Sequence, residues 1–259
     1  MKEVKIIFRF FSNSLQQHLT NIPIFIMFFF SKLARYGLFV SFLYFLVSGT
    51  TALSGYTTSQ ILFFYLTFVC IDTAVQLLFR EVYRFRPLIV SGGFDMILAK
   101  PMNPLIRVLL GGPDFIDAGV LVILLSVMLY ITASTLEVNF ASVVLFIAML
   151  VNTFIIATAF HILVLAVGIL TLSIDHLIMV YRDIVGLMRI PVDAFTNPLR
   201  FLITFVIPLG IMFTFPAKAI LGLLAWPMVL ISFFVGLTSI WLSLKFWHFA
   251  LKNYSSASS

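Results

Sequence analysis

Asp72 is a carboxylate inside a long apolar segment, 59–79, and its setting is the clearest sign of polar chemistry in the sequence. If that segment crosses a membrane, a charged side chain there costs roughly 2.5–3.5 kcal/mol on insertion scales unless it is paired or faces a polar cavity. Gln76 lies one helical turn away on the same face. We expect Asp72 and Gln76 to line a translocation path or a dimer seam. The alternative is an ion pair that only fixes helix packing.

A second group of ionisable side chains falls on one broad helical face later in the chain, at Asp175, His176, Arg182, Asp183 and Arg189. The first, third and last of these are spaced by seven residues, which is close to two helical turns. If 168–190 crosses the membrane, Arg182 is a candidate partner for Asp72, and His176 is a candidate proton-sensitive group. If the segment lies in the membrane interface instead, the same side chains form a solvated face.

Signatures of covalent chemistry, metal binding and nucleotide binding are absent from the sequence. It contains no G-x-x-x-x-G-K-[ST] phosphate loop, no H-E-x-x-H zinc motif and no G-x-S-x-G nucleophile elbow. Cys70 is the only cysteine, and the four histidines are scattered along the chain. We therefore expect no catalytic residue, no metal site and no cofactor bound by this chain.

The composition indicates what surrounds these polar groups. Of the 259 residues, 62% are hydrophobic and 10% are charged, and the mean hydropathy is +1.14. Soluble domains are about 45–50% apolar and about 25% charged, so the sequence predicts an all-α integral membrane protein in a lipid bilayer. The net charge of +6 does not indicate nucleic acid as a partner, because Lys and Arg punctuate the apolar stretches. We expect both termini on the cytoplasmic side.

The N-terminal segment 1–31 is predicted to be an amphipathic elbow. Its first 18 residues place apolar side chains on one helical face and basic or polar side chains on the other. This pattern is typical of a helix that lies in the cytoplasmic interface. We expect the rest of the elbow to bend in from the interface at Pro23. The first span then begins at about 32 and ends at about 50, with Lys32 and Arg35 reaching the inner headgroups.

The apolar stretches together predict a single transmembrane domain over 1–259. Its six spans are expected at about 32–50, 59–79, 115–135, 140–164, 168–190 and 220–244. Each is close to the roughly 20 residues that a helix needs to cross the hydrocarbon. The longest polar stretch, 80–114, joins the second and third spans, and it is predicted to be a cytoplasmic loop.

The region between 165 and 219 has two interpretations that differ in topology. On hydropathy and charge alone, 172–190 is a cytoplasmic amphipathic helix and 198–215 is the fifth span. All but one of the 16 Lys and Arg residues are then cytoplasmic, and Lys218 is the exception.

In the second interpretation, 168–190 is the fifth span, and 198–217 is a re-entrant outer hairpin broken at Pro208 and Pro216. This arrangement places two adjacent charged residues at membrane depth, at the energetic cost given above. Both interpretations give six spans and put both termini on the same side.

The segment 86–105 carries a recognisable pattern, RPLIVSGGFDMILAKPMNPL. It resembles a signature of ABC-2-type permeases, the membrane subunits of ABC exporters. The matching residues are Gly93, Asp95, Leu98, Lys100, Pro101, Pro104 and Leu105. Phe94 stands where the family usually has an acidic residue, and Met96 also departs from the pattern. Shorter matches occur at 54–56, 202–208 and 215–217.

The resemblance implies a role for about 91–105, because in this family a short coupling helix here seats in a groove of a separate ATPase. The residues themselves fit a short rigid element. Gly92 and Gly93 permit a sharp turn, and the two prolines exclude a long helix. The apolar residues between them predict a short ridge for docking, formed by Phe94, Ile97 and Leu98. The alternative is a plain interfacial loop on lipid headgroups.

The resemblance also implies a function, that of a permease subunit of an ATP-driven exporter in the inner (cytoplasmic) membrane. Two permease subunits, as a homodimer or a heterodimer, would work with a dimer of ABC ATPase subunits that holds the ATP and Mg. Members of the family resemble six-span subunits with re-entrant outer helices, which favours the second topology. The alternatives are a proton-coupled secondary transporter that uses Asp72 and His176, or an intramembrane enzyme.

Overall fold

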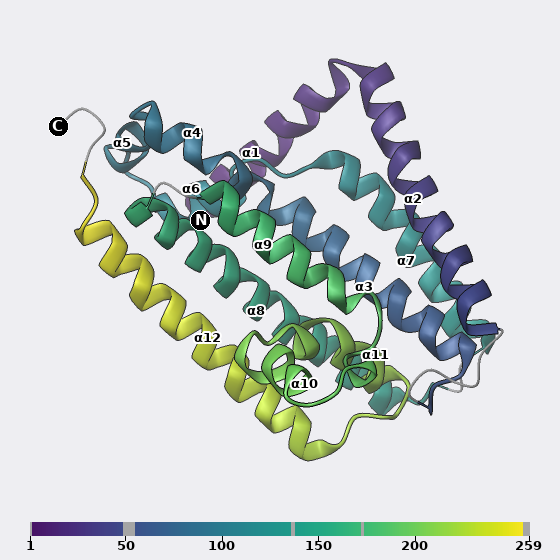
Figure 1. The fold of residues 1–259 in the computed structure, drawn as a ribbon. Coiled ribbons are helices and arrows are strands. Elements are labelled where there is room, and N and C mark those ends of the chain that lie inside the picture. Colours follow the sequence, from purple (N-terminus) through teal and green to yellow (C-terminus); the bar gives the residue numbers. More distant parts are fainter. Residues whose placement is uncertain (1, 49–54, 136–137, 172–173, 256–259) are drawn as a thin grey trace.

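The computed structural model describes residues 2–48, 55–135, 138–171 and 174–255, and every regular element in these ranges is a helix. Five helices are long and apolar enough to cross a membrane, and a bent pair of short helices makes a sixth when it is counted as one span. The long helices lie side by side in a bundle (Figure 1). The prediction of an all-α membrane protein is therefore confirmed, with five to six candidate spans.

The five long helices are α2 (Ile22–Ser48), α3 (Thr58–Phe79), α7 (Phe115–Thr135), α8 (Phe140–Thr171) and α12 (Trp226–Lys252). The ranges of α3 and α7 agree with the expected ones within one residue. The predicted boundaries at 164 and 220 are corrected, because α8 continues to Thr171 and α12 begins only at Trp226. The expected end of the first span at residue 50, and the short match that begins at Ser54, lie outside the described residues.

The N-terminal elbow differs from the prediction in where it bends. α1 (Lys2–Leu19) is followed almost at once by α2, which is one continuous helix. The expected bend within 22–31 is therefore wrong. Pro23 occupies the first turn of α2, where its missing N–H would have had no helical partner. Lys32 points toward α7 rather than toward headgroups, since its Nζ lies 2.5 Å from Oδ1 of Asp117.

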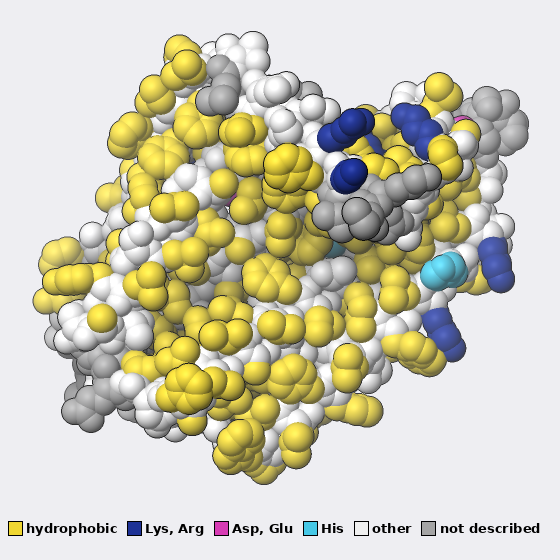
Figure 2. Space-filling model, turned by 180° about the vertical axis from the view of Figure 1, so that it is seen from behind, with side chains coloured by type: hydrophobic (Ala, Val, Ile, Leu, Met, Phe, Trp, Pro, Cys, Tyr) yellow, Lys and Arg dark blue, Asp and Glu magenta, His cyan; other side chains and the backbone are white. Residues whose placement is uncertain are grey.

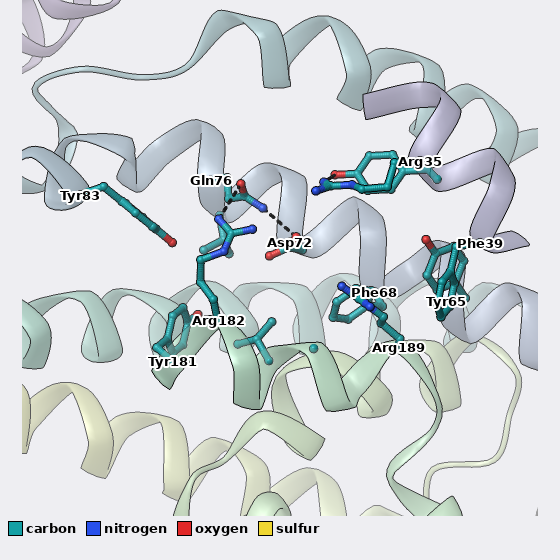
Figure 3. Close-up of a pocket in the computed structure, with 14 residues that line it drawn as sticks. Arg35, Phe39, Tyr65, Phe68, Asp72, Gln76, Tyr83, Tyr181, Arg182 and Arg189 are labelled. Atoms are coloured by element: carbon teal, nitrogen blue, oxygen red, sulfur yellow. Dashed lines mark hydrogen bonds between the residues drawn. The ribbon is translucent and has the colours of Figure 1, made fainter. Parts of the chain in front are cut away.

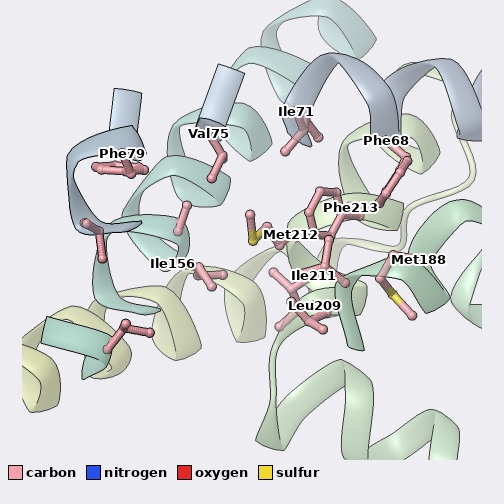
Figure 4. Close-up of a cluster of buried hydrophobic side chains, with 14 of the residues drawn as sticks. Phe68, Ile71, Val75, Phe79, Ile156, Met188, Leu209, Ile211, Met212 and Phe213 are labelled. Carbon is pink, nitrogen blue, oxygen red and sulfur yellow. The ribbon is translucent and has the colours of Figure 1, made fainter. Parts of the chain in front are cut away.

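α3 is the central helix of the bundle, and most of its side chains are buried. A capping box closes its N-terminus, because the side chains of Thr57 and Gln60 each accept a hydrogen bond from the other residue's backbone N–H. An apolar core packs against it (Figure 4), in which the rings of Phe68 and Phe213 have centroids 5.0 Å apart. Since other helices surround α3, its polar side chains face protein.

α8 and α12 form the most extensive helix–helix contact of the described residues. At Gly236 of α12, an added Cβ would meet Oδ1 of Asn152 in α8 at 2.0 Å, so only glycine permits this approach. Asn152 also donates from Nδ2 to the backbone oxygen of Ser232 at 2.9 Å. A small residue at the crossing and one interhelical hydrogen bond are typical of packing between membrane helices.

The chain after α8 is divided into short helices: α9 (Ile174–Gly186), η3 (Leu187–Arg189), η4 (Val192–Ala194), α10 (Leu199–Phe201), η5 (Leu202–Val206), η6 (Gly210–Thr214) and α11 (Phe215–Ile220). The predicted continuous span at 168–190 is wrong, because the first residues of that range belong to α8 and α9 has only 13 residues. On its own a helix of this length is about 20 Å long, against about 30 Å of hydrocarbon, so a crossing in this region has to be a broken one that includes residues beyond α9.

α9 runs antiparallel to α3 along one face of the bundle (Figure 1). Asp175, at its start, pairs with Arg86, which follows α3. Arg182, in its middle, bonds to Gln76 of α3. Arg189, in η3, lies beside the turns of α3 that precede Gln76. α9 and η3 together therefore follow α3 from one end of the bundle toward the other.

The helices from α10 to α11 form a bent pair, which we call the hairpin (199–220). Its two limbs meet at 78°, and the break falls around Pro208, as expected. Pro216 does not break the second limb, because it lies in the first turn of α11, where proline is tolerated. The predicted break at Pro216 is therefore wrong.

The predicted loop 80–114 contains four short helices: η2 (Arg80–Arg84), α4 (Phe85–Val90), α5 (Gly93–Leu98) and α6 (Pro104–Leu110). Helical structure does not stop at the end of α3, because η2 and α4 continue it to Val90. Gly92 has a φ of +73° and turns the chain between α4 and α5. Figure 2 shows Lys and Arg gathered at this end of the molecule, on a face that is otherwise mostly hydrophobic. We call it the α5 end.

Candidate functional site

A cavity of about 130 Å³ opens between α2, α3, α9 and η3 (Figure 3). Its charged and amide side chains come from three separate stretches of sequence: Arg35, Asp72, Gln76, Arg182 and Arg189. Its other walls are mainly aromatic: Tyr36, Phe39, Tyr65, Phe68, Tyr83 and Tyr181. We call this site the arginine cavity.

A chain of hydrogen bonds links the two helices that face each other across the cavity. Gln76 donates from Nε2 to Oδ2 of Asp72 at 2.7 Å, and Arg182 donates from an Nη to Oε1 of Gln76 at 3.2 Å. Gln76 is buried, so both ends of its amide are satisfied within the protein. The expected partnership of Asp72 and Arg182 is therefore indirect, with an amide between the two charges.

Two further arginines are positioned by aromatic rings. The guanidinium of Arg35 lies 5.0 Å from the ring centre of Tyr36 and donates to its hydroxyl at 3.3 Å. The guanidinium of Arg189 lies 5.3 Å from the ring centre of Phe39. Cation–π contacts of this kind hold a planar cation in place without neutralising it. The cavity therefore has three arginines and one aspartate, an excess of two positive charges.

The predicted polar face of 168–190 is split by the structure. Arg182 lines the cavity together with Asp72 and Gln76. Asp175 does not, because it pairs with Arg86 at 2.7 Å, and both side chains are about half exposed. His176 and Asp183 are exposed and do not line the cavity. Seven-residue spacing grouped these side chains, but α9 turns only part of that face toward α3.

Sequence reasoning missed Arg35 and Arg189 as members of the site. Arg35 was expected only to reach the headgroups, and the structure places its guanidinium over the ring of the next residue, at the edge of the cavity. Arg189 was noticed only as part of the heptad spacing. A signal was present for Arg35, which lies in a segment rich in Phe and Tyr, whereas the sequence around Arg189 offers none.

A second charged cluster lies where the hairpin meets the start of α3. Asp193 accepts a hydrogen bond from Tyr56 at 2.8 Å, lies 2.6 Å from Nζ of Lys218 and also pairs with Arg200. We call these four residues the hairpin cluster. Burial alone would raise the pKa of Asp193, but the hydrogen bonds from Lys218 and Tyr56 and the charges of Lys218 and Arg200 outweigh it, so the pKa is lowered. Burial, and next the bonded Asp193, raises the pKa of Tyr56. Sequence reasoning did not single out Asp193.

The helix α5 occupies the place expected for the short docking element, but it presents different residues. Phe94 is fully buried, with its ring centroid 5.1 Å from that of Phe85, 5.2 Å from Tyr254 and 6.5 Å from Trp247. Ile97 is buried as well. The predicted exposed ridge of Phe94, Ile97 and Leu98 is therefore wrong for its first two members.

The exposed surface of α5 and the turn after it consists of Met96, Leu98, Ala99, Lys100 and Pro101. We call it the α5 surface. Of the other residues predicted there, Gly93, Asp95 and Pro104 are half-buried and Leu105 is buried. The side chain of Asn103 caps α6 by accepting the backbone N–H of Leu105. The Pro-x-x-Pro segment thus ends one short helix and begins the next.

The side chains of these sites offer charges, hydrogen-bond donors and exposed apolar surface. Among the described residues, no group of three His, Cys, Asp or Glu side chains is placed to hold a metal ion. Cys70 is buried. The arginine cavity can hold a charged group by hydrogen bonds and charge, and the α5 surface can contact another protein.

The comparison with known families gives one match. A model of the ABC-2 family transporter proteins matches residues 33–258, which include the arginine cavity, the hairpin cluster and α5. No curated protein and no solved structure matches the chain.

Proposed function

The chain belongs to the ABC-2 family of transporter proteins, and from this premise we propose that it is the membrane permease subunit of an ATP-driven exporter. The match covers nearly the whole chain rather than one segment. Family membership is the observation that carries the proposal. The apolar helices of the chain fit a multi-pass membrane protein. We place it in the cytoplasmic membrane as part of the proposal.

The energy source is placed on a separate ATPase, because the sequence has no phosphate-binding loop of its own. A dimer of such ATPase subunits would bind ATP and Mg and would contact two permease subunits, identical or related. The α5 surface supports a docking role, since Met96 is 69% exposed and Leu98 is 38% exposed beside Lys100. Methionine is enriched in protein interfaces, and a lysine beside it suits the polar rim of such a contact.

The buried side of α5 supports a mechanical role for the same helix. The ring of Phe94 contacts Phe85 at the start of α4, Trp247 near the end of α12, and Tyr254 just after it. A push on α5 would therefore reach both the extension of α3 and the end of α12. To shift the permease decisively between two states, ATPase closure must favour one of them by about 5.5 kcal/mol.

For topology we propose that α9 and η3 form the fifth crossing and that the hairpin is re-entrant from the outside. The antiparallel path of α9 along α3 supports this arrangement, as does the pairing of its charges with Arg86 and Gln76. Both termini and the α5 end would then be cytoplasmic. The test is a Phe195→Cys variant labelled from outside intact cells. Cys70 is buried and should give little background, and protection of the new cysteine would contradict the proposal.

The decisive test of the function is co-purification with an ATPase from the native host. We expect Lys100→Glu, which reverses a charge on the α5 surface, to lower the recovered ATPase about tenfold while leaving the permease inserted. Arg9→Glu is the matched control, because it reverses an exposed charge on α1. Undiminished recovery with Lys100→Glu would remove the docking role from α5. ATP-independent transport by the purified chain alone would refute the proposed function.

The proton-coupled alternative loses part of its basis in the structure. It needed Asp72 and His176 to act on one path, but His176 is exposed and does not line the arginine cavity. We therefore do not propose it.

A further inference from the structure

We propose that the arginine cavity binds the anionic headgroup of an amphiphilic substrate, a phosphate or a group of similar charge and size. This inference rests on the proposed function, because it names the class of molecule that such a permease would export. It is carried by the charge, the hydrogen-bond donors, the size and the aromatic walls of the cavity.

The first argument is the charge balance. Arg35, Arg182 and Arg189 face a single carboxylate, Asp72. Inside a helix bundle, an excess of positive charge is costly unless a counter-charge enters or water reaches it. All three arginine residues are exposed enough to be reached from outside the protein. Water can therefore keep them charged while the cavity is empty, and their excess of positive charge attracts an entering anion and repels a cation.

The second argument is that donors remain after the internal bonds are made. Arg182 bonds to Gln76 and Tyr83, and Arg35 bonds to Tyr36 through one Nη, while a guanidinium has five N–H donors. Asp72, in contrast, already accepts a hydrogen bond from Gln76. Guanidinium groups bind phosphate and carboxylate in bidentate geometry, which suits a site with spare N–H groups.

The third argument is size. The cavity holds about 130 Å³, below the roughly 300–1,000 Å³ of sites that enclose drug-sized ligands. It is large enough for a headgroup but not for a whole amphiphile. The tail must therefore lie elsewhere.

The aromatic walls indicate where the tail lies. Phe39 lines the cavity, and its ring centroid is 5.8 Å from that of Phe42, which is 57% exposed. Leu38 and Phe45 on the same helix are also more than 70% exposed. An apolar path therefore leads from the cavity onto the surface of α2. An alkyl chain can follow this path while its headgroup stays among the arginines.

The test is binding to the purified full-length chain in nanodiscs of neutral lipid, measured by microscale thermophoresis with no ATPase present. The probes are dodecyl phosphate, dodecyltrimethylammonium and inorganic phosphate. We expect dodecyl phosphate to bind at least tenfold more tightly than either of the others. Equal binding of the cationic probe would overturn the charge assignment. Equal binding of inorganic phosphate would overturn the assignment of a tail.

Substitutions of the cavity's arginine and aspartate should change the affinity for dodecyl phosphate in opposite directions, which identifies the binding site. Arg182→Gln should weaken dodecyl phosphate binding about tenfold or more, whereas Arg86→Gln, which removes an exposed arginine outside the cavity, should leave it unchanged. Asp72→Asn removes the only negative charge of the cavity and should strengthen binding. Loss of binding in Asp72→Asn would overturn the proposal, even if Arg182→Gln failed to fold. Because no ATPase enters the assay, a failed co-purification would not affect this result.

Discussion

The arginine cavity and the hairpin cluster each combine one aspartate with several cationic side chains. The two sites differ in whether the aspartate contacts those cations directly. In the hairpin cluster, Asp193 contacts Lys218, Arg200 and Tyr56 directly, and the side chains of Asp193 and Lys218 are only 12% and 13% exposed. In the arginine cavity, Gln76 stands between Asp72 and Arg182. In the first arrangement the aspartate pairs directly with cations, although Arg200 and Lys218 also line a cavity of about 280 Å³, while in the second an amide separates the aspartate from the nearest bonded arginine. The comparison shows that one aspartate beside several cationic side chains can be held either by direct ion pairs or through a bridging amide, and the two arrangements should differ in how much each aspartate contributes to stability.

The largest expected difference between the two regions is in stability. Asp193→Asn leaves Lys218 without its counter-charge, and removing one partner of a largely buried pair costs about 3 kcal/mol. Asp72→Asn should cost less than about 1 kcal/mol, because its carboxylate pairs directly with an amide rather than a cation. The measurement is the free energy of unfolding in detergent micelles by SDS titration. Equal losses in the two variants would break the comparison.

The next largest effect is expected at Gln76, whose side-chain amide links Asp72 to Arg182 in the arginine cavity. Gln76→Leu should lower the free energy of unfolding by about 1–3 kcal/mol, because the donor to Asp72 and the acceptor for Arg182 disappear together. A double-mutant cycle with Asp72→Asn should be non-additive, since the two residues share a bond. Simple additivity in that cycle would show that the bond contributes nothing.

Matched tyrosine variants sharpen the comparison at the level of single hydroxyl groups. Tyr56→Phe removes a 2.8 Å hydrogen bond to a carboxylate and should cost about 1.5 kcal/mol of stability. Tyr36→Phe removes two long contacts of 3.3 Å, to Arg35 and Thr73, and should cost about 0.5 kcal/mol or less. Thermal unfolding of both purified variants gives the ranking. A larger loss of stability in Tyr36→Phe than in Tyr56→Phe would show that the stronger tyrosine hydrogen bonds lie in the arginine cavity.

The smallest effect is the dependence of stability on pH. The lowered pKa of Asp193 means that its carboxylate is stabilised in the folded state, so its contribution is complete above the unfolded pKa of about 3.9. The contribution is lost as the pH falls through the lower folded value. We expect the wild type to lose more stability between pH 5 and pH 3 than Asp193→Asn does. Parallel pH profiles of unfolding temperature would contradict this.

The sequence predicted the fold best where long apolar segments decide it. α3 and α7 match the expected ranges because about 20 apolar residues leave little choice of length. Prediction failed where a local rule has an exception, as at Pro23, which begins a helix instead of bending one. It also failed in 168–190, because a hydropathy pattern does not reveal how far α8 continues before the chain turns.

The candidate site was predictable only as far as local spacing reaches. Asp72 and Gln76 are four residues apart, so their bond follows from helical geometry. Arg35 and Arg189 join them only through packing between α2, α3 and η3, which no spacing encodes. The same is true of Asp193, whose partners Tyr56 and Lys218 are distant in sequence. Phe94 is a different kind of failure. Its position in the motif suggested an exposed side chain, but its ring is buried.

The contact between Gly236 and Asn152 has a consequence for how this molecule can move. The Asn152 side chain packs directly against Gly236, and α8 and α12 make the most extensive contact between described helices, so a shift of one against the other would disrupt this packing. We expect α8 and α12 to keep their relative position during any transport cycle. α2 is mostly unburied in the bundle, and it is the long helix with the most freedom to swing against these two helices. A cross-link between α8 and α12 should then leave turnover intact, while one between α2 and α3 should stall it.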